Sequence, residues 1–163
     1  MNPYPELQTL RYRLGHIDCK DVSILQEIFD DDQTKQYLPE LNDLVSSEEG
    51  IKIFLDSFDK YADCDEGFLW GIYLKSKLLG FIAVMDIPYK PTLFYALHSS
   101  YRSQGIMKEG VTQVMNYLSE FNKCSCILSE VYKDNIASIK LLGSLGFENT
   151  GFDEQKIFFS RIF

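Results

Sequence analysis

The sequence predicts a mixed α/β fold in which helices cover a central sheet that is not wholly parallel. Strand-like segments alternate with segments whose apolar residues recur at helical spacing. Two consecutive strand-like segments are joined by a short polar connection, which is typical of an antiparallel hairpin. With 163 residues and a hydrophobic content of 45%, the chain can bury one core, and no linker or repeat divides it. We therefore expect a single domain over residues 1–163, with elements in the order β-α-α-β-β-β-α-β-α-β-β.

The first expected strand has one buried face. Residues 10–14 alternate between apolar side chains and arginines, which is the period-two pattern of such a strand. Asp18 is then a candidate cap for a helix whose apolar residues between 22 and 29 follow at helical spacing. The acidic run at residues 30–32 is expected to end this helix.

A second helix is expected to begin at the capping box Ser46-Ser47-Glu48-Glu49. The apolar residues of 51–61 lie on one side of this helix. Between the two helices, residues 37–45 are expected to form a loop or a short helical turn. Residues 68–74 and 78–87 are rich in aromatic and branched side chains and form the expected hairpin.

The next strand leads through a polar turn directly into a helix. Residues 92–98 are expected to form the strand, with Phe94 and Tyr95 on opposite faces. The turn covers residues 102–107, and the apolar residues of 107–118 recur at helical spacing. Strand, tight turn and helix therefore follow one another without a long loop.

The last third of the chain is expected to contain one more helix between strands. A strand over residues 124–132 is followed by Asp134-Asn135, which caps a helix that Gly146 closes. Residues 147–150 and 156–163 then read as a terminal hairpin. Its second strand could pair with a second copy of the chain or be covered by the sheet itself, so both a monomer and a homodimer remain open.

Charge and hydropathy exclude several classes of function. The formal net charge of -8 opposes attraction to nucleic acid, and no cluster of Lys and Arg offers a local exception. No apolar stretch approaches the roughly 20 residues that span a bilayer. The N-terminus also lacks the basic and apolar runs of a signal peptide. We expect a cytoplasmic protein that binds neither nucleic acid nor membranes.

The cysteines do not predict a metal site. Only Cys124 and Cys126 are close together, and their C-x-C spacing puts both on one face of the expected strand. Such a pair more often fills packing space than binds a metal. Because His16 and His98 are isolated from the pair, we expect no metal.

The turn from Arg102 to Met107 is the clearest local indication of a ligand. A strand that breaks into a turn and at once begins a helix leaves the first helical N–H groups unpaired. The helix start attracts an anion such as phosphate, Gly105 permits close approach of the backbone, and a basic residue lies beside it. A glycine that serves only to make a turn gives the same pattern. The local pattern leaves both interpretations open.

The order of motifs along nearly the whole chain resembles the GNAT acyltransferase superfamily, especially its RimJ/RimL-type N-acetyltransferases. The family pattern begins with a strand that ends in an Arg-Leu pair, here Arg13-Leu14. It continues with an R-x-x-G-x-G/A turn, here residues 102–107. A segment N-x-x-S that leads to Gly-Phe follows, here Asn135-Ile136-Ala137-Ser138 and then Leu145-Gly146-Phe147.

Two positions depart from the family pattern. Met107 replaces the last small residue of the turn, and Leu142 replaces a tyrosine that protonates the departing thiolate in many relatives. Both departures support an alternative function, a non-catalytic acyl-CoA-binding or interaction module with the same fold.

The resemblance implies a GNAT-like fold, in which a mostly antiparallel mixed sheet of about six to seven strands is flanked by about four helices. It also implies acetyl-CoA as the cosubstrate and no metal. The reaction is then transfer of the acetyl group to a primary amine, of a protein N-terminus or a small molecule, by direct attack in a ternary complex. The residues expected at the cofactor are Leu97, His98, Arg102, Ser103, Gln104, Gly105, Ile106, Met107, Asn135 and Ser138.

The resemblance also indicates how the reaction is assisted. It implies an oxyanion donor among the backbone N–H groups around Leu97 and His98, which we assign to Leu97, and a proton donor to the leaving thiolate, which we assign to Ser138. The residues themselves leave open whether the Ser138 hydroxyl instead satisfies backbone groups of its own helix. They also leave open whether Asn135 contacts the cofactor or only caps that helix.

No single group stands out as the general base. Glu130 is our candidate, with Asp86 and His98 at strand ends as alternatives, and an exposed amine can also lose its proton to solvent. On the acceptor side, Tyr37-Leu38-Pro39 resembles the family segment that helps to close the acceptor site. Several aromatic residues could line an acceptor pocket, although most are expected in the core: Tyr37, Phe68, Trp70, Phe81, Phe94 and Tyr95.

Overall fold

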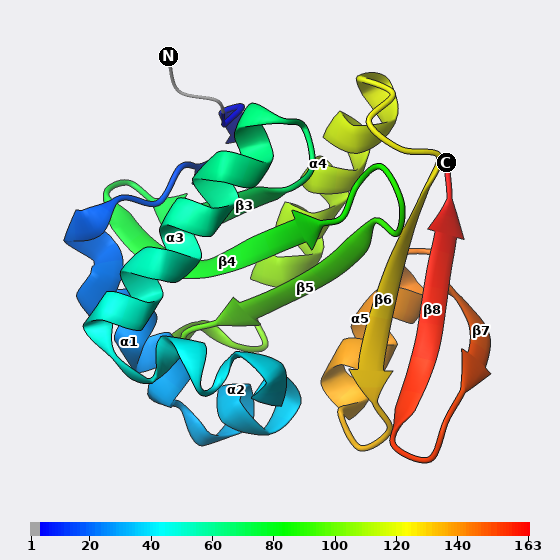
Figure 1. The fold of residues 1–163 in the computed structure, drawn as a ribbon. Helices are drawn as coiled ribbons and strands as arrows, with labels where there is room; N and C mark the ends of the chain where they lie inside the picture. The colour runs from blue at the N-terminus through cyan, green and yellow to red at the C-terminus, as the bar shows by residue number, and fades with distance from the viewer. Residues whose placement is uncertain (1–3) are drawn as a thin grey trace.

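The computed structural model describes residues 4–163, and these form one mixed sheet of eight strands in the order β1-β2-β3-β4-β5-β6-β8-β7 (Figure 1). The mixed α/β fold expected from the sequence is confirmed. Residues 1–3, part of the N-terminal stretch in which no signal peptide is expected, lie outside the described residues. The strands are β1 (Leu7–Gln8), β2 (Arg13–Gly15), β3 (Phe68–Leu74), β4 (Lys77–Met85), β5 (Thr92–Leu97), β6 (Cys126–Tyr132), β7 (Glu148–Phe152) and β8 (Lys156–Ile162). The α-helices are α1 (Val22–Asp30), α2 (Asp32–Tyr37), α3 (Glu48–Asp63), α4 (Ile106–Glu120) and α5 (Ile136–Ser144).

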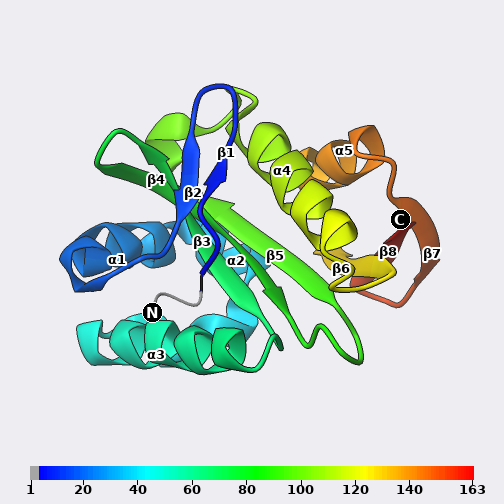
Figure 2. The same cartoon turned by 90° about the horizontal axis from the view of Figure 1, so that it is seen from above.

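Helices cover both faces of the sheet. Figure 2 shows α1 and α3 on one face of the central strands, and α4 and α5 on the other. The alternation of side chains in β5 follows this division. The Phe94 ring lies 6.3 Å from that of Phe58 in α3, whereas the hydroxyl of the next residue, Tyr95, contacts Ser138 in α5. The sequence correctly predicts that the two aromatic residues face opposite sides.

The N-terminal strand differs from the expectation over residues 10–14. The chain forms a tight hairpin between β1 and β2, in which the Thr9 N–H donates to the Tyr12 carbonyl over 2.8 Å. Leu10 therefore lies at the hairpin tip and is 95% exposed, whereas Leu14 in β2 is buried. The expectation of a strand is wrong for residues 10–12, because β2 begins only at Arg13 and the apolar-basic alternation runs through the turn as well as the strand.

The first and second expected helices begin close to their predicted caps. The Ser47 hydroxyl accepts the Gly50 N–H over 3.1 Å and so caps α3. Asp18 accepts the Lys20 N–H and caps a 3₁₀ turn (Cys19–Asp21) that leads into α1. The predicted hairpin of β3 and β4 is also confirmed as antiparallel.

The acidic run after α1 ends that helix, as predicted, and also begins α2. The Asp31 carboxylate accepts the Thr34 N–H over 3.1 Å and caps α2. The sequence does not predict α2 because its residues, Asp32–Tyr37, are mostly polar and have no apolar stripe at helical spacing.

β5 and β6 are parallel neighbours that meet at a single register pair, Thr92 with Leu128. The Leu128 N–H donates to the Pro91 carbonyl over 2.7 Å, and beyond this point the strands diverge (Figure 1). Among the described residues, the edge of β5 from Tyr95 to Leu97 has no strand partner on the β6 side. This divergence opens the sheet where the strand leads into α4.

The C-terminal hairpin is inserted so that its second strand is internal. β8 pairs antiparallel with β6 on one side and with β7 on the other. Of the two possibilities left open by the sequence, the structure therefore has this strand covered by the sheet itself, and Phe159 within it is buried. β7 forms the outer edge. No helix among residues 4–163 is long and apolar enough to cross a membrane.

Candidate active site

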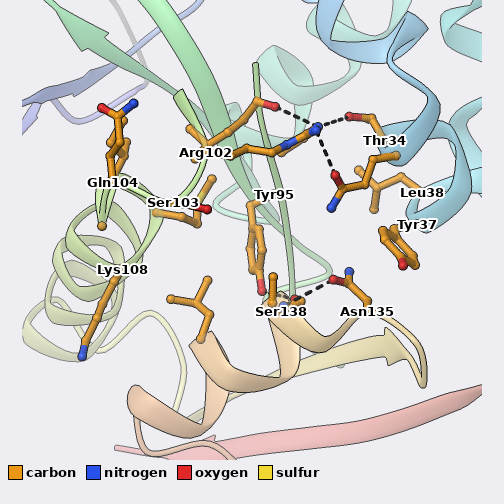
Figure 3. Close-up of a pocket in the computed structure, with 18 residues that line it drawn as sticks. Thr34, Tyr37, Leu38, Tyr95, Arg102, Ser103, Gln104, Lys108, Asn135 and Ser138 are labelled. Carbon is orange, nitrogen blue, oxygen red and sulfur yellow. Dashed lines mark hydrogen bonds between the residues drawn. The ribbon is translucent and has the colours of Figure 1, made fainter. Parts of the chain in front are cut away.

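A cavity of about 400 Å³ lies where β5 and β6 diverge (Figure 3). Its walls come from α2 and the residues after it, from the end of β5, from the turn that starts α4, and from the start of α5. In the sequence, the lining residues extend from Gln33 to Leu141, and the open sheet brings them together. The lining residues are Gln33, Thr34, Tyr37, Leu38, Tyr95, Ala96, Leu97, residues 102–108, Asn135, Ala137, Ser138 and Leu141.

The turn before α4 presents free amides at this cavity. Ser103 and Gly105 both have a left-handed backbone, with φ of 63° and 76°, and no side chain caps the helix at Gly105. Within the described residues, the first helical bond runs from the Glu109 N–H to the Gly105 carbonyl over 3.2 Å. The N–H groups of residues 106–108 therefore have no helical acceptor, and such a helix start binds an anion.

The guanidinium of Arg102 is committed to protein groups. It donates to the Asp31 carboxylate over 2.6 Å and to the Gln33 side-chain carbonyl over 2.9 Å, and Figure 3 shows it turned toward Thr34. Lys108 also lines the cavity, and among residues 4–163 its ammonium has no hydrogen-bond or ion-pair partner. The uncompensated cation at the turn is thus Lys108, which the sequence reasoning does not single out.

The backbone of β5 turns the Leu97 N–H toward the cavity. The His98 N–H donates to the Leu79 carbonyl of the neighbouring segment over 2.8 Å, so the backbone of His98 faces β4. Backbone groups alternate along a strand, which turns those of Leu97 to the open side. The Leu97 carbonyl accordingly accepts a hydrogen bond from Arg102 over 3.4 Å. Of the two amides left by the sequence reasoning, only that of Leu97 faces the opening.

At the start of α5, Asn135 and Ser138 lie side by side on the cavity wall. The Asn135 side-chain carbonyl accepts the Ser138 N–H over 3.3 Å, so the capping role of Asn135 is confirmed. The Ser138 hydroxyl is hydrogen-bonded to the Tyr95 hydroxyl across the cavity, not to the backbone of its own helix. Burial raises the pKa of Tyr95 to about 12, although the hydrogen bond with Ser138 acts in the opposite direction.

The structure does not bring the three candidate bases to the cavity. Glu130 lies on the exposed side of β6, with its carboxylate 3.6 Å from the Lys90 ammonium and 3.7 Å from that of Lys156. The His98 ring is hydrogen-bonded to Glu27 over 3.0 Å. Neither of them, nor Asp86, is among the lining residues. The strand alternation that buries Ser129 and Val131 turns Glu130 outward.

The two departures from the family pattern are both packing residues. Met107 is 7% exposed and Leu142 is fully buried, and both belong to the hydrophobic core. A methionine in the first turn of α4 can direct its thioether into the core while its backbone borders the cavity. Of the aromatic candidates, Tyr37 and Tyr95 line the cavity, whereas Phe68, Trp70 and Phe81 are in the core.

The lining residues that the sequence does not indicate include Lys108 and the α2 residues Gln33 and Thr34, and Tyr95 is named only among several aromatics that could line an acceptor pocket. The alternation with Phe94 could have indicated Tyr95, because it puts one of two adjacent aromatics on the far side of the sheet. The α2 residues carry no sequence signal. No three His, Cys, Asp or Glu side chains within residues 4–163 form a group that could hold a metal ion.

Several proteins whose sequence or structure resembles this chain are named as N-acetyltransferases or acetyltransferases. A protein from Bacillus subtilis (strain 168), the uncharacterized N-acetyltransferase YoaA, is 26% identical over 153 residues, which cover 91% of this chain and 85% of YoaA. Among solved structures, RimL, a ribosomal L7/L12 α-N-protein acetyltransferase in complex with coenzyme A, matches with a TM-score of 0.86 at 16% identity, over 97% of this chain and 98% of RimL. The ribosomal-protein-S5-alanine acetyltransferase of Vibrio fischeri matches with a TM-score of 0.81 at 19% identity, over 98% and 97% of the two chains.

The similarity to these solved structures shows the fold, and the match to a sequence family shows the family to which the chain belongs. The acetyltransferase (GNAT) domain family matches residues 11–148, which include every lining residue of the cavity and most of the sheet. This chain belongs to the GNAT acetyltransferase family.

Proposed function

We propose that this chain transfers the acetyl group of acetyl-CoA to the α-amine of a protein or peptide N-terminus, with small-molecule amines as the alternative acceptors. The chain is an N-acetyltransferase by family, and acetyl-CoA is the donor. One observation carries the assignment of the site. The uncapped start of α4, the Leu97 N–H and the Ser138 hydroxyl border one cavity, so an anion site and two groups suited to acyl transfer are contiguous.

The cofactor half of the cavity fits the acidic end of acetyl-CoA. The free amides of residues 106–108 suit a pyrophosphate, and the ammonium of Lys108 adds an uncompensated positive charge. Arg102 contributes through the backbone of the turn, because Asp31 already neutralises its guanidinium. Ser103, Gln104 and Gly105 complete the cradle through their backbone.

Acyl transfer in this cavity needs a neutral amine, a donor for the developing oxyanion and protonation of the leaving sulfur. The Leu97 N–H donates to the carbonyl oxygen of the thioester, and the Ser138 hydroxyl supplies a proton to the thiolate. None of the described lining residues is a carboxylate or a histidine. The amine therefore loses its proton to water or to the serine hydroxyl, and Glu130 takes no part in this scheme.

The acceptor half of the cavity supports a neutral, partly apolar recognition surface. Gln33, Thr34, Tyr37 and Leu38 line it, and none of these side chains carries a charge. The names of RimL and of the Vibrio fischeri enzyme state that these proteins acetylate ribosomal proteins. An extended peptide N-terminus, whose backbone needs neutral hydrogen-bonding partners, suits such a wall.

The alternative function, a non-catalytic acyl-CoA-binding or interaction module, is not supported by the two departures from the family pattern. Met107 and Leu142 are explained by packing, and neither removes a lining group that the proposed chemistry needs. This alternative still makes a distinct prediction, namely binding of acetyl-CoA without release of thiol in the presence of any amine.

Calorimetric titration with acetyl-CoA and with free CoA tests the cofactor half. A thiol-release assay with N-terminal peptides, spermidine and amino-acid amides then tests the acceptor half. Ser138→Ala should lower turnover about 100-fold with little change in acetyl-CoA affinity. Ser144→Ala on the same helix, whose hydroxyl is bonded to the Leu141 carbonyl, is the matched control. No binding of either cofactor form at millimolar concentration would contradict the proposal.

A further inference from the structure

Tyr95 and Ser138 join the two walls of the cavity through their hydroxyl groups. Tyr95 lies in β5 and Ser138 in α5, so 43 positions separate them in the sequence. Figure 3 shows the tyrosine ring directed across the cavity toward the serine, with both residues at its wall. The contact therefore lies between the strand that carries the Leu97 amide and the helix that carries the proposed proton donor.

The hydrogen-bonding groups around Ser138 limit what its hydroxyl does. The backbone N–H of Ser138 already donates to the side-chain carbonyl of Asn135. A serine hydroxyl has one proton to donate and can accept from two donors. If Tyr95 donates to the serine oxygen, the serine proton is left free to point into the cavity. If the serine donates to Tyr95, its proton points away from the reaction.

The direction of donation follows from the surroundings of Tyr95. The phenol is the stronger acid of the two hydroxyls and is the better hydrogen-bond donor. Burial raises its pKa to about 12, so at neutral pH it keeps its proton and is not the ultimate source of one. The tyrosine can therefore hold the serine without becoming charged.

We propose that Tyr95 is a positioning residue that donates its hydrogen bond to the Ser138 oxygen and directs the serine proton toward the leaving sulfur. This inference rests on the proposed function of the site. In the step it serves, the amine nitrogen forms a bond to the thioester carbon and the carbon–sulfur bond breaks, with its electron pair left on sulfur. The serine hydroxyl gives its proton to sulfur and receives one from the amine nitrogen, so serine and tyrosine end as they began.

Steady-state kinetics of four proteins test the coupling: the wild type, Tyr95→Phe, Ser138→Ala and the double variant. Tyr95→Phe should lower kcat about tenfold and leave KM for acetyl-CoA unchanged, because the serine remains but is no longer aligned. In the Ser138→Ala background, the second substitution should change kcat by less than about twofold. Independent, multiplicative losses would overturn the proposal.

Tyr117→Phe is the matched control for the lost hydroxyl. Tyr117 lies in α4 and packs against Phe68 and Trp70, away from the cavity. This variant should retain wild-type kcat. A loss of kcat equal to that of Tyr95→Phe would mean that general loosening of the fold explains both, and the positioning role would be rejected.

The bound thiol of CoA gives a second readout that needs no acceptor. A hydrogen bond from Ser138 to the thiolate lowers the pKa of the CoA thiol, because it stabilises the charged form. Thiolate absorbance of bound CoA, with desulfo-CoA as the blank, should give a thiol pKa about one unit lower in the wild type than in Tyr95→Phe or Ser138→Ala. The charged lining groups, Arg102 and Lys108, are the same in all these proteins, so their effect cancels.

The outcomes separate this inference from the proposed function. If Ser138→Ala lowers kcat and raises the pKa of the CoA thiol, but Tyr95→Phe changes neither quantity, the serine acts without the tyrosine. In that case this inference fails and the proposed function stands. If Tyr95→Phe is impaired and Ser138→Ala is not, the tyrosine itself protonates sulfur, which contradicts both assignments. Wild-type behaviour of both variants rejects Ser138 as the donor and removes the basis of the inference.

Discussion

Nη2 of Arg102 lies 2.6 Å from Oδ2 of Asp31, so the arginine of the anion-binding turn is paired with the residue that caps α2. The same guanidinium reaches the Leu97 carbonyl at the end of β5. One side chain therefore connects the turn, the strand that carries the proposed oxyanion donor, and the helix that lines the acceptor side. Arg102 therefore has a structural role in the fold that does not require its guanidinium to bind a phosphate.

The first prediction concerns the strength of this pair. Arg102→Gln and Asp31→Asn should each destabilise the fold, and a double-mutant cycle in urea unfolding should give a coupling of about 1 kcal/mol, since both side chains are partly exposed. Acetyl-CoA affinity should change by less than about threefold in Arg102→Gln, because the charge is already compensated. A loss of affinity much larger than this would make the guanidinium a phosphate ligand.

The second prediction concerns pH. Burial acts to raise the pKa of Asp31, but hydrogen bonds from Arg102 and Thr34 outweigh it, and the pKa is lowered in the folded state. A lowered folded pKa contributes stability above the unfolded value of about 3.9, and this is lost as the pH falls through the folded pKa. The stability difference between wild type and Asp31→Asn should therefore be constant above about pH 5 and shrink below about pH 4.

Urea unfolding from pH 3 to pH 7 measures this difference. Repeating the series in the Arg102→Gln background should flatten the pH dependence, because the main hydrogen-bond donor to Asp31 is then missing. An unchanged slope in that background would show that Arg102 does not cause the lowered pKa.

The third prediction uses Gly105, which is left-handed at φ 76° and whose added Cβ would meet only the Arg11 side chain, at 3.5 Å. Asn and Asp both tolerate this backbone, so Gly105→Asn and Gly105→Asp are matched in shape and differ in charge. The Asp variant should bind acetyl-CoA at least about tenfold more weakly than the Asn variant, because it repels the pyrophosphate. Equal affinities of the two variants for acetyl-CoA in calorimetry would show that the pyrophosphate does not bind at this turn.

The fourth prediction concerns Lys108. Lys108→Ala should raise the Kd for acetyl-CoA about tenfold at low salt, and the effect should narrow as ionic strength rises. Lys52→Ala is the control, because Lys52 pairs with Glu48 on the surface of α3, on the opposite face of the sheet. An effect of Lys108→Ala that does not depend on salt would indicate a change of shape and not of charge.

The fifth prediction separates packing from obstruction at Met107. Because the side chain belongs to the core, Met107→Ala should cost about 2–5 kcal/mol of unfolding free energy. Acetyl-CoA affinity should stay within about threefold of wild type. If affinity instead rises strongly, the methionine obstructs the cofactor, as its place in the family motif first indicates.

Local patterns predict most of the elements but not all of their boundaries. Ser47 is recognisable as a cap because its hydroxyl bonds three residues ahead, which is a local interaction. Leu10 misleads because a tight hairpin and a strand share the same alternation over a few residues. The spacing of apolar residues does not predict α2, because this helix has no apolar stripe. It is defined instead by the cap at Asp31 and by the contact of Asp31 with Arg102.

The candidate site is predicted where it depends on the chain order of motifs, and missed where it depends on distant pairs. The turn at residues 102–107 and the pair Asn135 and Ser138 all line the cavity. Glu130 does not, because its side of β6 is set by which face the rest of the strand buries. The contact of Tyr95 with Ser138 depends on the opening between β5 and β6, which no local pattern records.

The placement of β8 between β6 and β7 affects how the protein is made. β6 has no neighbour on its outer side until residues 156–162 are available, so this half of the sheet cannot assemble in the order of synthesis. A nascent chain that has reached β7 carries a bare β6 edge, which is a template for wrong pairing. The strand that precedes the Ser138 helix therefore gains its outer partner only when the last residues of the chain are available.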